Sequence, residues 1–560
     1  MSAYSDDNTD PELLKYVPKW SREQPATPNA ELRQVSTSAS TVPSFEEGRQ
    51  YRPRPPLWPR PIPEPPAQRE DRSLGWVGQS ALVAVISAVV ALLVVFAKPL
   101  LEGASFLNSD SQTKQVTNPS NRHTANDAPV NSALIPAIAA APSATAQAQQ
   151  VPPSLAQGQQ AALSPISKPL GQESSVNSAV RGVTDSEIRF GISAPFTGPA
   201  KELGQHMKQG IEAAFNVVNA KGGLYGRQLR LIAADDGYEP TRTAAAMKQL
   251  YEKDQVFGLV GNVGTPTAVV ALPYALDRKM LFFGAFTGAG LLRNDPPDRY
   301  VFNYRASYAE ETAAVVNYLV KVRRLLPEQI AVFAQQDAYG DAGFTGVEKA
   351  IRSLQGGNQS PILRLNYQRN TVDVDDAVAQ LQQRNAQLQQ RRHFPIKAVI
   401  MVPTYRAAAK FIEKTRDLYP DLIYTSVSFV GSTALADELV LLGKKYTTGV
   451  IVTQVVPAVD GHSSLALDYK SALGKYFPGE APDYVSLEGY VDASVLIAVL
   501  QRNGSELDTE RLIGTLENLH DLDIGIGTPV VFSRSDHQGV HKVWGTQLDE
   551  AGHYQPIDLQ

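Results

Sequence analysis

The most constraining feature of the sequence is an alternation that begins after Asp185, in which short runs of apolar and β-branched residues are followed by longer amphipathic runs. This rhythm is typical of parallel strands joined by helices, and it predicts an α/β fold with helices on both faces of each sheet. The expected strands lie at residues 187–193, 228–234, 257–261, 281–284, 329–334 and 397–402, and the expected helices at 204–220, 241–253, 265–278, 309–323, 343–354 and 405–418.

Residues 181–560 are more than one sheet usually organises, so two α/β lobes with a cleft between them are the simplest arrangement. In open α/β sheets, ligands bind beyond the carboxyl ends of the strands. A ligand site is therefore expected in the cleft, on the loops that follow the strands.

The first 180 residues differ in composition from the rest of the chain. They contain long stretches rich in Pro, Ser, Ala, Gln and Asn, which cannot bury enough apolar surface to fold. Residues 1–75 are predicted to be disordered, and the proline-dense run Tyr51–Pro66 to be extended. That run is either a spacer or a docking peptide of the PxxP kind. Pro11–Trp20 (PELLKYVPKW) has the pattern of a short amphipathic turn that could bind a partner.

Trp76–Ala97 contains no charged residue, and its 22 residues at 1.5 Å rise per residue give about 33 Å, enough to cross a hydrocarbon core. A cleavable signal peptide has a shorter apolar stretch after a short leader, so an uncleaved transmembrane helix is expected. Basic residues are more frequent before the stretch than after it, which places the N-terminus in the cytoplasm and the long C-terminal part outside. The residues compared are Arg52, Arg54, Arg60, Arg69 and Arg72 against Lys98, Lys114 and Arg122.

Two further features accompany this expected anchor. Residues 98–180 are rich in small and polar residues and are expected to form a flexible linker. Ser80, Ala84 and Ala88 recur at four-residue spacing, which would let two such helices pack closely as a dimer, although small residues are common in membrane spans.

The composition and the motifs of the sequence argue against several classes of function. A formal net charge of −5 with mixed signs lacks the basic face that nucleic-acid binding needs, so no nucleic acid is expected as a partner. The absence of cysteine excludes disulfides, thiolate nucleophiles and zinc sites built on cysteine. The eight histidines are dispersed, only His537 and His541 lie four apart, and no metal is expected. The sequence contains no GxSxG elbow, P-loop or GxGxxG motif, so neither catalysis nor a cofactor is expected.

Two acidic clusters have structural interpretations. Asp235 and Asp236 are neighbours on an expected strand, so their side chains point to opposite faces and are not expected to act as an acid and base pair. One of them should be a loop carboxylate. Asp373–Asp376 precede a helical pattern and are expected to supply an N-cap and acids that favour the helix dipole, rather than a calcium loop.

Four loops after expected strands carry groups suited to a ligand. At Gly264 and Thr265 a helix begins, with Thr265 as the expected N-cap and Pro266 as the first helical residue, so free backbone N–H groups should face the cleft and suit an anion. A plain helix start explains this pattern as well. The other loops offer rings, hydroxyls and close backbone approach through Phe286, Thr287 and Gly288, then Tyr339, then Tyr405.

A series of motifs runs along residues 185–560. They are Gly191–Gly198 in the first-strand loop, Asn219–Arg227 (NAKGGLYGR) with Asp235–Asp236 after the next strand, the Asn262–Thr267 turn, Phe286–Gly288, Asp337–Gly340 and the closing Phe532–Gly539. In this order they resemble the type I periplasmic binding proteins, the receptors of ABC transporters for branched-chain amino acids and amides. The resemblance implies a two-lobed Venus-flytrap fold with three crossovers, in which lobe 1 spans about 185–306 and 448–530 and lobe 2 about 307–447 and 531–560.

By the same resemblance, the first lobe holds the ligand carboxylate and the second lobe supplies aromatic walls. The residues implied are Thr265, Phe286, Thr287 and Gly288 with Thr197, Tyr238 and Gly264 on the first lobe, and Tyr339, Tyr405 and the loop 431–433 on the second. Many members of the family that it resembles carry an acidic residue, which binds the ammonium in amino acid binders, after the strand that corresponds to SFVG. Ser432 and Thr433 stand there in this chain, which speaks against a plain α-amino acid and leaves an amide, a keto or aromatic acid, or a peptide-like compound open.

The expected function is that of a receptor, tethered to the inner membrane with its binding domain in the periplasm, that delivers an amino-acid-like or related small organic solute to an ABC permease. The alternative is a ligand sensor or scaffold that acts through its cytoplasmic proline-rich segment. A structural role in the cell envelope is a third interpretation, and it predicts that no solute binds.

Overall fold

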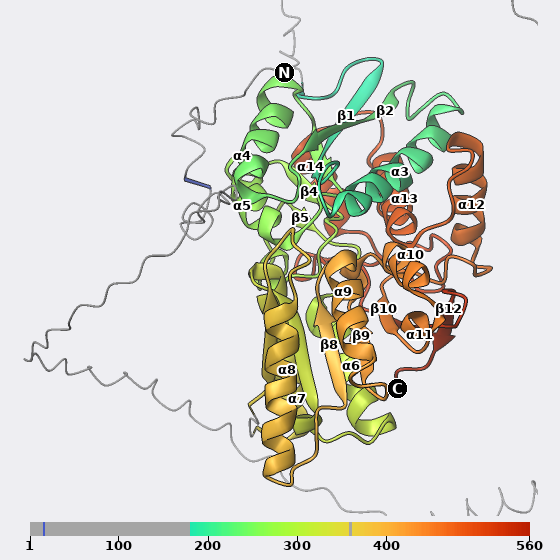
Figure 1. Cartoon of the computed structure of the whole chain (residues 1–560). Helices are drawn as coiled ribbons and strands as arrows, with labels where there is room; N and C mark the ends of the chain where they lie inside the picture. Colours follow the sequence, from blue (N-terminus) through green and yellow to red (C-terminus); the bar gives the residue numbers. More distant parts are fainter. Residues whose placement is uncertain (1–14, 17–179, 358–360) are drawn as a thin grey trace, which may run out of the picture. The chain divides into compact units, whose positions relative to one another are not determined.

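Two α/β lobes make up the folded part of the chain in the computed structural model, which describes residues 15–16, 180–357 and 361–560 (Figure 1). The two-lobed α/β architecture expected from the sequence is confirmed. The expected span at 76–97, most of the leader and nearly all of the expected linker lie outside the described residues. Among the helices that are described, none is both long and apolar enough to cross a membrane.

The first lobe is built on a five-stranded parallel sheet with the order β2-β1-β3-β4-β5. Its strands are β1 (Glu187–Ala194), β2 (Gln228–Asp235), β3 (Gly258–Val260), β4 (Leu281–Phe283) and β5 (Val301–Phe302). Its helices are α3 (Lys201–Asn219), α4 (Pro240–Lys248) with the π-helical turn η2 (Gln249–Lys253), α5 (Thr265–Asp277), η3 (Gly290–Leu292), α12 (Ser464–Tyr476), α13 (Tyr484–Asn503) and α14 (Thr509–Glu517). The strand order reverses at β1, so a topological switch point for a ligand lies between β1 and β3.

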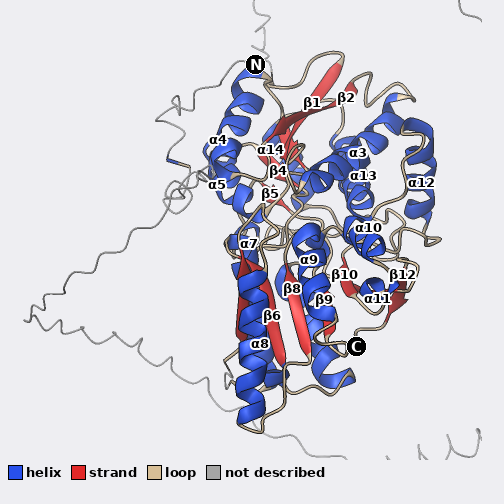
Figure 2. Cartoon of the chain, viewed as in Figure 1, coloured by secondary structure: helices blue, strands red, loops and turns tan. Residues whose placement is uncertain are grey.

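The second lobe is built on a seven-stranded sheet with the order β12-β11-β10-β9-β8-β6-β7 (Figure 2). Five of its strands are parallel, namely β6 (Ile330–Gln335), β7 (Leu363–Tyr367), β8 (Ala398–Val402), β9 (Ile423–Ser426) and β10 (Ile451–Gln454), and the edge pair β11 (Trp544–Leu548) and β12 (Tyr554–Ile557) is antiparallel. Its helices are α6 (Tyr308–Asn317) with η4 (Tyr318–Val322), η5 (Pro327–Gln329), α7 (Ala338–Leu354), α8 (Asp375–Gln390), α9 (Tyr405–Arg416), η6 (Ser428–Val430), α10 (Ser432–Leu442) and α11 (Lys444–Thr447).

Burial explains why these runs become central strands. Every residue of β6 and of β8 is buried, as expected for parallel strands that helices cover on both faces. Local signals set the helix starts: α6 begins at a capping box between Ser307 and Glu310. In α8 the N-cap is Val374, while Asp375 and Asp376 lie in the first turn, where acidic side chains favour the helix dipole.

Three crossovers join the lobes, and two of them lie later than the resemblance implied. Strand β10 pairs with β9, so the chain leaves the second sheet after Gln454 rather than near 448. Phe532 packs against Phe283 and Phe302 of the first sheet, so the last return comes at β11 rather than near 531. The first and third crossovers hydrogen-bond to each other, since the Asn303 carbonyl accepts from the Gly539 N–H at 2.7 Å.

The first lobe depends on a close crossing of α3 and α13. A Cβ atom added at Gly210 would overlap the carbonyl oxygen of Ser486, and one added at Gly489 would overlap the carbonyl oxygen of Met207. Only glycine lets the two helix backbones approach this closely. The pair therefore sets the distance between the helices that cover this side of the first sheet.

Gly210→Ala is expected to lower the free energy of unfolding by about 1–3 kcal/mol, because the added methyl group forces two helix backbones apart. Chemical denaturation measures the change. Gly514→Ala in α14 is the matched control: its Cβ would meet no atom within 4 Å, and alanine is the better helix former, so stability should stay level or rise by up to about 1 kcal/mol. Equal losses in both variants would contradict the close crossing.

Candidate ligand-binding site

Loops that follow the strands of both lobes meet in one cluster of aromatic rings. Phe286, after β4, and Tyr238, after β2, come from the first lobe, and Phe429, after β9, comes from the second. The Phe429 ring centroid lies 5.1 Å from that of Phe286 and 6.1 Å from that of Tyr238. The Tyr238 hydroxyl also accepts a hydrogen bond from Nε2 of Gln335 at 3.2 Å. The lobes are thus in direct contact at the expected cleft.

A pair of threonine hydroxyls lies at the start of α5. The hydroxyl oxygens of Thr265 and Thr287 are 2.7 Å apart, and both side chains are fully buried. The sequence predicted Thr265 as the N-cap of α5, and this prediction is wrong. Gly264 takes that position with a φ of 106°, a conformation that disfavours other residues, and this frees the Thr265 hydroxyl to reach Thr287. The hydroxyl pair therefore lies at the positive end of the helix dipole.

Aromatic side chains of the second lobe face this pair. The Tyr339 ring lies 4.6 Å from Phe429 and 5.3 Å from Tyr308, the first residue of α6. The Tyr339 hydroxyl donates to the carbonyl of Pro403 at 3.3 Å, so its polar group serves the second lobe and its ring faces the cluster. Burial raises the pKa of Tyr308 to about 12, although the Thr287 hydroxyl and the Gly288 N–H nearby act to lower it. The Tyr308 hydroxyl is therefore neutral and lies next to the threonine pair.

Behind the rings lies a buried ion cluster centred on Arg305, in the first crossover. Arg305 pairs with Glu311 of α6 at 3.1 Å and with Glu488 of α13 at 3.2 Å, and it also donates to the Ser428 hydroxyl. Burial alone would lower the pKa of Arg305, but the two carboxylates hold it above its usual value. The guanidinium carbon lies 5.0 Å from the Phe286 ring centroid.

At the mouth of the cleft, polar side chains connect the lobes. Arg369 binds Glu239 of the first lobe at 2.7 Å and Asp337 of its own lobe at 3.1 Å. Asn370 donates to Glu239 at 2.6 Å and to the carbonyl of Gly237 at 3.1 Å. These contacts hold the loop after β2 against the loop after β7.

The two aspartates after β2 have opposite environments, as their neighbouring positions predict. Asp236 is fully buried and accepts from the Ser193 hydroxyl at 2.8 Å and from the Tyr238 N–H at 2.9 Å. Burial raises the pKa of Asp236 to about 7. Burial would also raise the pKa of Asp235, but hydrogen bonds from the Thr197 hydroxyl, neighbouring N–H groups and Arg242 lower it to about 2. Asp235 is the loop carboxylate, and Asp236 positions the loop that carries Tyr238.

The pKa of Asp236 predicts a pH dependence of stability. Because the folded-state pKa lies above the ordinary value near 4, the folded state holds the proton more tightly, so this contribution is complete below pH 4 and is lost as the pH rises through 7. The free energy of unfolding of Asp236→Asn should therefore rise relative to that of the wild type between pH 4 and 7. The expected gain is a few kcal/mol at most, because one unit of pKa shift corresponds to about 1.4 kcal/mol. Urea denaturation across this range measures it.

The neighbouring variant Asp235→Asn is the control, with the opposite sign. The folded-state pKa of Asp235 is lowered, so the wild type should gain relative to this variant as the pH rises from about 2 to 4. If the difference in free energy of unfolding between the wild type and Asp236→Asn stays constant from pH 4 to 7, the raised pKa of Asp236 is refuted.

The structure brings most of the residues predicted from the sequence together, and separates three of them. Tyr238, Gly264, Thr265, Phe286, Thr287, Gly288 and Tyr339 lie on the loops around the ring cluster. Thr197 is exposed and donates to Asp235 at 2.6 Å. Ser432 is buried, and its hydroxyl pairs with Gln454. Tyr405 is buried beside Gly431, outside the ring contacts of Phe429.

Three residues of the site were missed by the sequence interpretation. Tyr308 could have been found from the capping box Ser307-x-x-Glu310, which marks the start of α6. Phe429 lies in the run SFVG, and the sequence interpretation considered only the residues that follow this run. Arg305 carried no local signal, because its carboxylate partners come from two distant helices.

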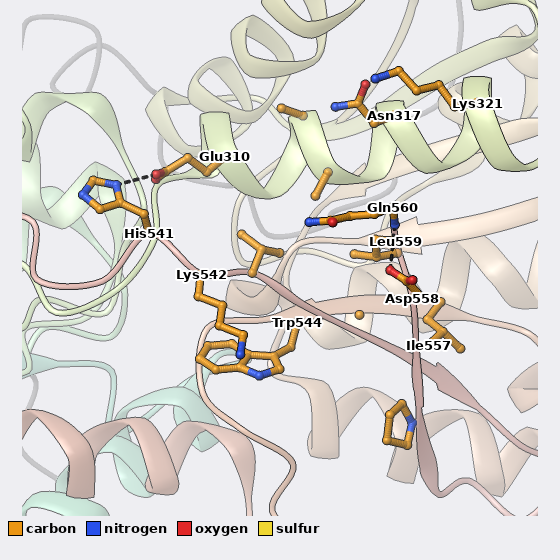
Figure 3. A pocket seen from close by; sticks show the side chains of 15 residues that line it. Glu310, Asn317, Lys321, His541, Lys542, Trp544, Ile557, Asp558, Leu559 and Gln560 are labelled. Carbon is orange, nitrogen blue, oxygen red and sulfur yellow. Dashed lines mark hydrogen bonds and ion pairs between the residues drawn. The ribbon is translucent and has the colours of Figure 1, made fainter. Parts of the chain in front are cut away.

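A separate cavity of about 900 Å³ lies on the second lobe, between α6 with η4 on one side and β11 with β12 on the other (Figure 3). Lys321, Lys542, Trp544 and Leu559 line it, and the ion pair of Glu310 with His541 at 2.7 Å lies at one end. None of the ligand residues predicted from the sequence lines this cavity, and it is not between the lobes. Within the described ranges, no group of three or more His, Cys, Asp or Glu side chains could hold a metal ion.

The comparison with known families decides the classification. A family model described as periplasmic binding protein matches residues 187–553, which include both sheets up to β11. The chain belongs to the periplasmic binding protein family. The resemblance to the type I members of this family is confirmed.

This periplasmic binding protein has several relatives. A possible leucine/isoleucine/valine-binding protein from Rhodopirellula baltica is 41% identical, with a TM-score of 0.62 and coverage of 68% of this chain and 98% of that chain. Leu/Ile/Val-binding protein homolog 3 of Brucella melitensis is 25% identical over 349 residues, which are 61% of this chain and 86% of the relative. A branched chain amino acid ABC transporter protein from Thermus thermophilus with bound valine shares the fold at 15% identity, with a TM-score of 0.56 over 67% of this chain and 96% of that chain.

Proposed function

We propose that this periplasmic binding protein is the solute-binding component of an ABC transporter, and that its ligand is a branched-chain amino acid or a closely related carboxylate. The observation that carries the proposal is the hydroxyl pair of Thr265 and Thr287 at the positive end of α5, opposite the aromatic rings of the second lobe. The relatives named as Leu/Ile/Val-binding proteins support the same ligand class.

The first lobe suits a carboxylate for two reasons. The first turn of a helix presents N–H groups without partners in the helix, and its dipole favours a negative charge. The hydroxyls of Thr265 and Thr287 can each donate to an anion once their mutual hydrogen bond opens. Gly264 and Gly288 let the rings of Tyr238 and Tyr308 pack directly against the backbone of these loops.

The second lobe suits an apolar ligand side chain. The rings of Tyr339, Tyr308 and Phe429 pack within 4.6–6.4 Å of one another, and they would have to separate to admit a solute between the lobes. A small branched side chain needs less displacement than a large one. We therefore propose a ligand of the size of leucine rather than a peptide.

The amino group of such a ligand is the open part of the proposal. Ser432 is uncharged and its hydroxyl is hydrogen-bonded to Gln454, and the charge of Glu311 is paired with Arg305, so neither residue offers a free negative charge to an ammonium group. The Tyr308 hydroxyl could accept a hydrogen bond from an ammonium group or donate one to a keto oxygen, so it would tolerate either group. Attachment through the apolar stretch at 76–97 would keep the domain close to its permease.

A panel of three leucine analogues tests the ligand class by calorimetry on the full-length protein in detergent. Leucine and its keto acid, 4-methyl-2-oxopentanoate, should bind, whereas leucinamide, which lacks the carboxylate, should bind at least tenfold more weakly because the charge-assisted hydrogen bonds to the first lobe are lost. Binding of leucinamide as tight as that of leucine would refute the carboxylate site. Absence of binding by the whole panel, extended to valine and isoleucine, would refute the ligand class.

Substitution of the hydroxyl pair tests the site itself. Thr265→Val or Thr287→Val should raise the dissociation constant about tenfold or more, since each removes one hydrogen bond to a charged group, worth about 1.5–3 kcal/mol. Tyr339→Phe should change the affinity little, because that hydroxyl is directed to Pro403. Thr415→Val is the control, because this buried threonine donates to the Phe411 carbonyl within α9. Equal weakening by the Thr265 and Thr415 variants would place the ligand elsewhere.

A further inference from the structure

Tyr16 lies on the first lobe, although 261 positions of sequence separate it from its nearest polar partner there. Residues 15–16 are drawn in blue beside α4 and α5 in Figure 1. Only 6% of the Tyr16 side chain is exposed. A tyrosine from a leader of low hydrophobicity is thus buried as deeply as a core residue of the domain.

The contacts of Tyr16 satisfy both of its chemical groups. The hydroxyl donates to Oδ2 of Asp277 at 2.8 Å and accepts from Nη1 of Arg278 at 2.9 Å. The ring meets Tyr274 edge to face, with the centroids 5.1 Å apart. A buried tyrosine needs an apolar contact for its ring and a polar partner for its hydroxyl, and this surface provides both.

The receiving surface, which we call the tyrosine site, consists of Arg181, Tyr251, Tyr274, Asp277 and Arg278. Two arginines stack on its two tyrosines: the guanidinium carbon of Arg278 lies 3.6 Å from the Tyr274 ring centroid, and that of Arg181 lies 3.6 Å from the Tyr251 ring centroid. The two tyrosine rings lie 6.2 Å apart. Stacked guanidinium groups hold these side chains in place before a further ring is added.

The tyrosine site continues the core of the first lobe. Tyr16 belongs to the hydrophobic cluster that contains Met247, Val270 and Tyr274, on the α4 and α5 side of the first sheet. It lies at the C-terminal end of α5, whereas the candidate ligand site lies at the N-terminal end of the same helix. The two sites are therefore separate.

We propose that Tyr16 anchors the N-terminal segment of this chain, in the stretch PELLKYVPKW, to the tyrosine site of its own first lobe. The surface is matched to one side chain with one hydroxyl, and the segment that supplies it is the one whose pattern already suggested a docking motif. The proposal stands apart from the identity of the ligand, because no residue of the tyrosine site lies at the cleft.

The docking has a consequence for membrane topology. Residues 76–97 lie between Tyr16 and the domain, so a single crossing of a membrane by that stretch would place the two on opposite sides. The single membrane crossing expected from the sequence and the docking of Tyr16 within one chain therefore exclude each other. With Tyr16 docked, the N-terminal segment and the binding domain share one compartment.

Hydrogen exchange on the full-length protein in detergent tests the contact. Tyr16→Ala should cause a loss of amide protection in the peptide that covers the end of α5 around Tyr274–Arg278, and Tyr16→Phe, which keeps the ring but not the hydroxyl, should cause a smaller loss. Tyr51→Ala, in the same leader, is the matched control and should leave this peptide unchanged. Unchanged protection in Tyr16→Ala would overturn the proposal. A loss of wild-type protection on dilution would assign the contact to a second copy and would overturn docking within one chain.

Thiol labelling in spheroplasts tests the shared compartment, and it is clean because the chain contains no native cysteine. The single-cysteine variants are Ser5→Cys in the leader and Leu441→Cys on the second lobe, where 84% of the Leu441 side chain is exposed. Under the proposal, a membrane-impermeant maleimide labels both variants or neither. Labelling of Leu441→Cys alone, with Ser5→Cys labelled only after lysis, would overturn the proposal and establish the single crossing. Neither outcome changes with the identity of the solute.

Discussion

The buried charge of Arg305 is the interaction on which the arrangement of the two lobes depends. A guanidinium removed from water is tolerable only when acidic partners and hydrogen bonds surround it, and the loss of one partner from such a cluster costs several kcal/mol. Arg305 therefore requires Glu311 of α6, Glu488 of α13 and Ser428 of η6 to converge on the first crossover. That convergence brings the start of α6, with Tyr308, next to the loop that carries Phe286.

The contacts at the mouth of the cleft are of a different kind, and the difference suits a protein that opens. Arg369 keeps its pair with Asp337, a residue of its own lobe, when the contact with Glu239 breaks. Glu239 is about a third exposed, so it returns to water at little cost. The crossover side is thus held by the buried charges around Arg305, whose separation costs several kcal/mol. The mouth is held by the pair of Arg369 and Glu239, whose separation costs less. Opening about the crossovers is the motion that this distribution allows.

Much of the fold followed from periodicity alone. Strands β1, β2, β6 and β8 were predicted within a residue or two, because a buried parallel strand is read directly from its apolar run. The boundaries near 448 and 531 could not be set in this way. The run IVTQ of β10 contains no residue that marks its lobe, and only its pairing with β9 assigns it to the second sheet. Likewise, Gly264 and Thr265 are adjacent, and the choice of N-cap between them depends on the hydrogen bond that Thr287 offers from another loop.

The same limit applies more strongly to Tyr16. The amphipathic pattern of Pro11–Trp20 marked the segment as a docking motif, but it did not identify Tyr16 as the anchoring residue, because the groups that select it lie on the other side of the contact. The tyrosine site combines Tyr251 from η2 with Asp277 and Arg278 from the end of α5, and folding of the first lobe alone brings these together. Helix α5 is thus used at both ends: its first turn contributes the hydroxyl and dipole proposed for the solute carboxylate, and its last turn binds a side chain of the leader. The two ends are separated by the buried middle of the helix, which includes Val270 and Ala271.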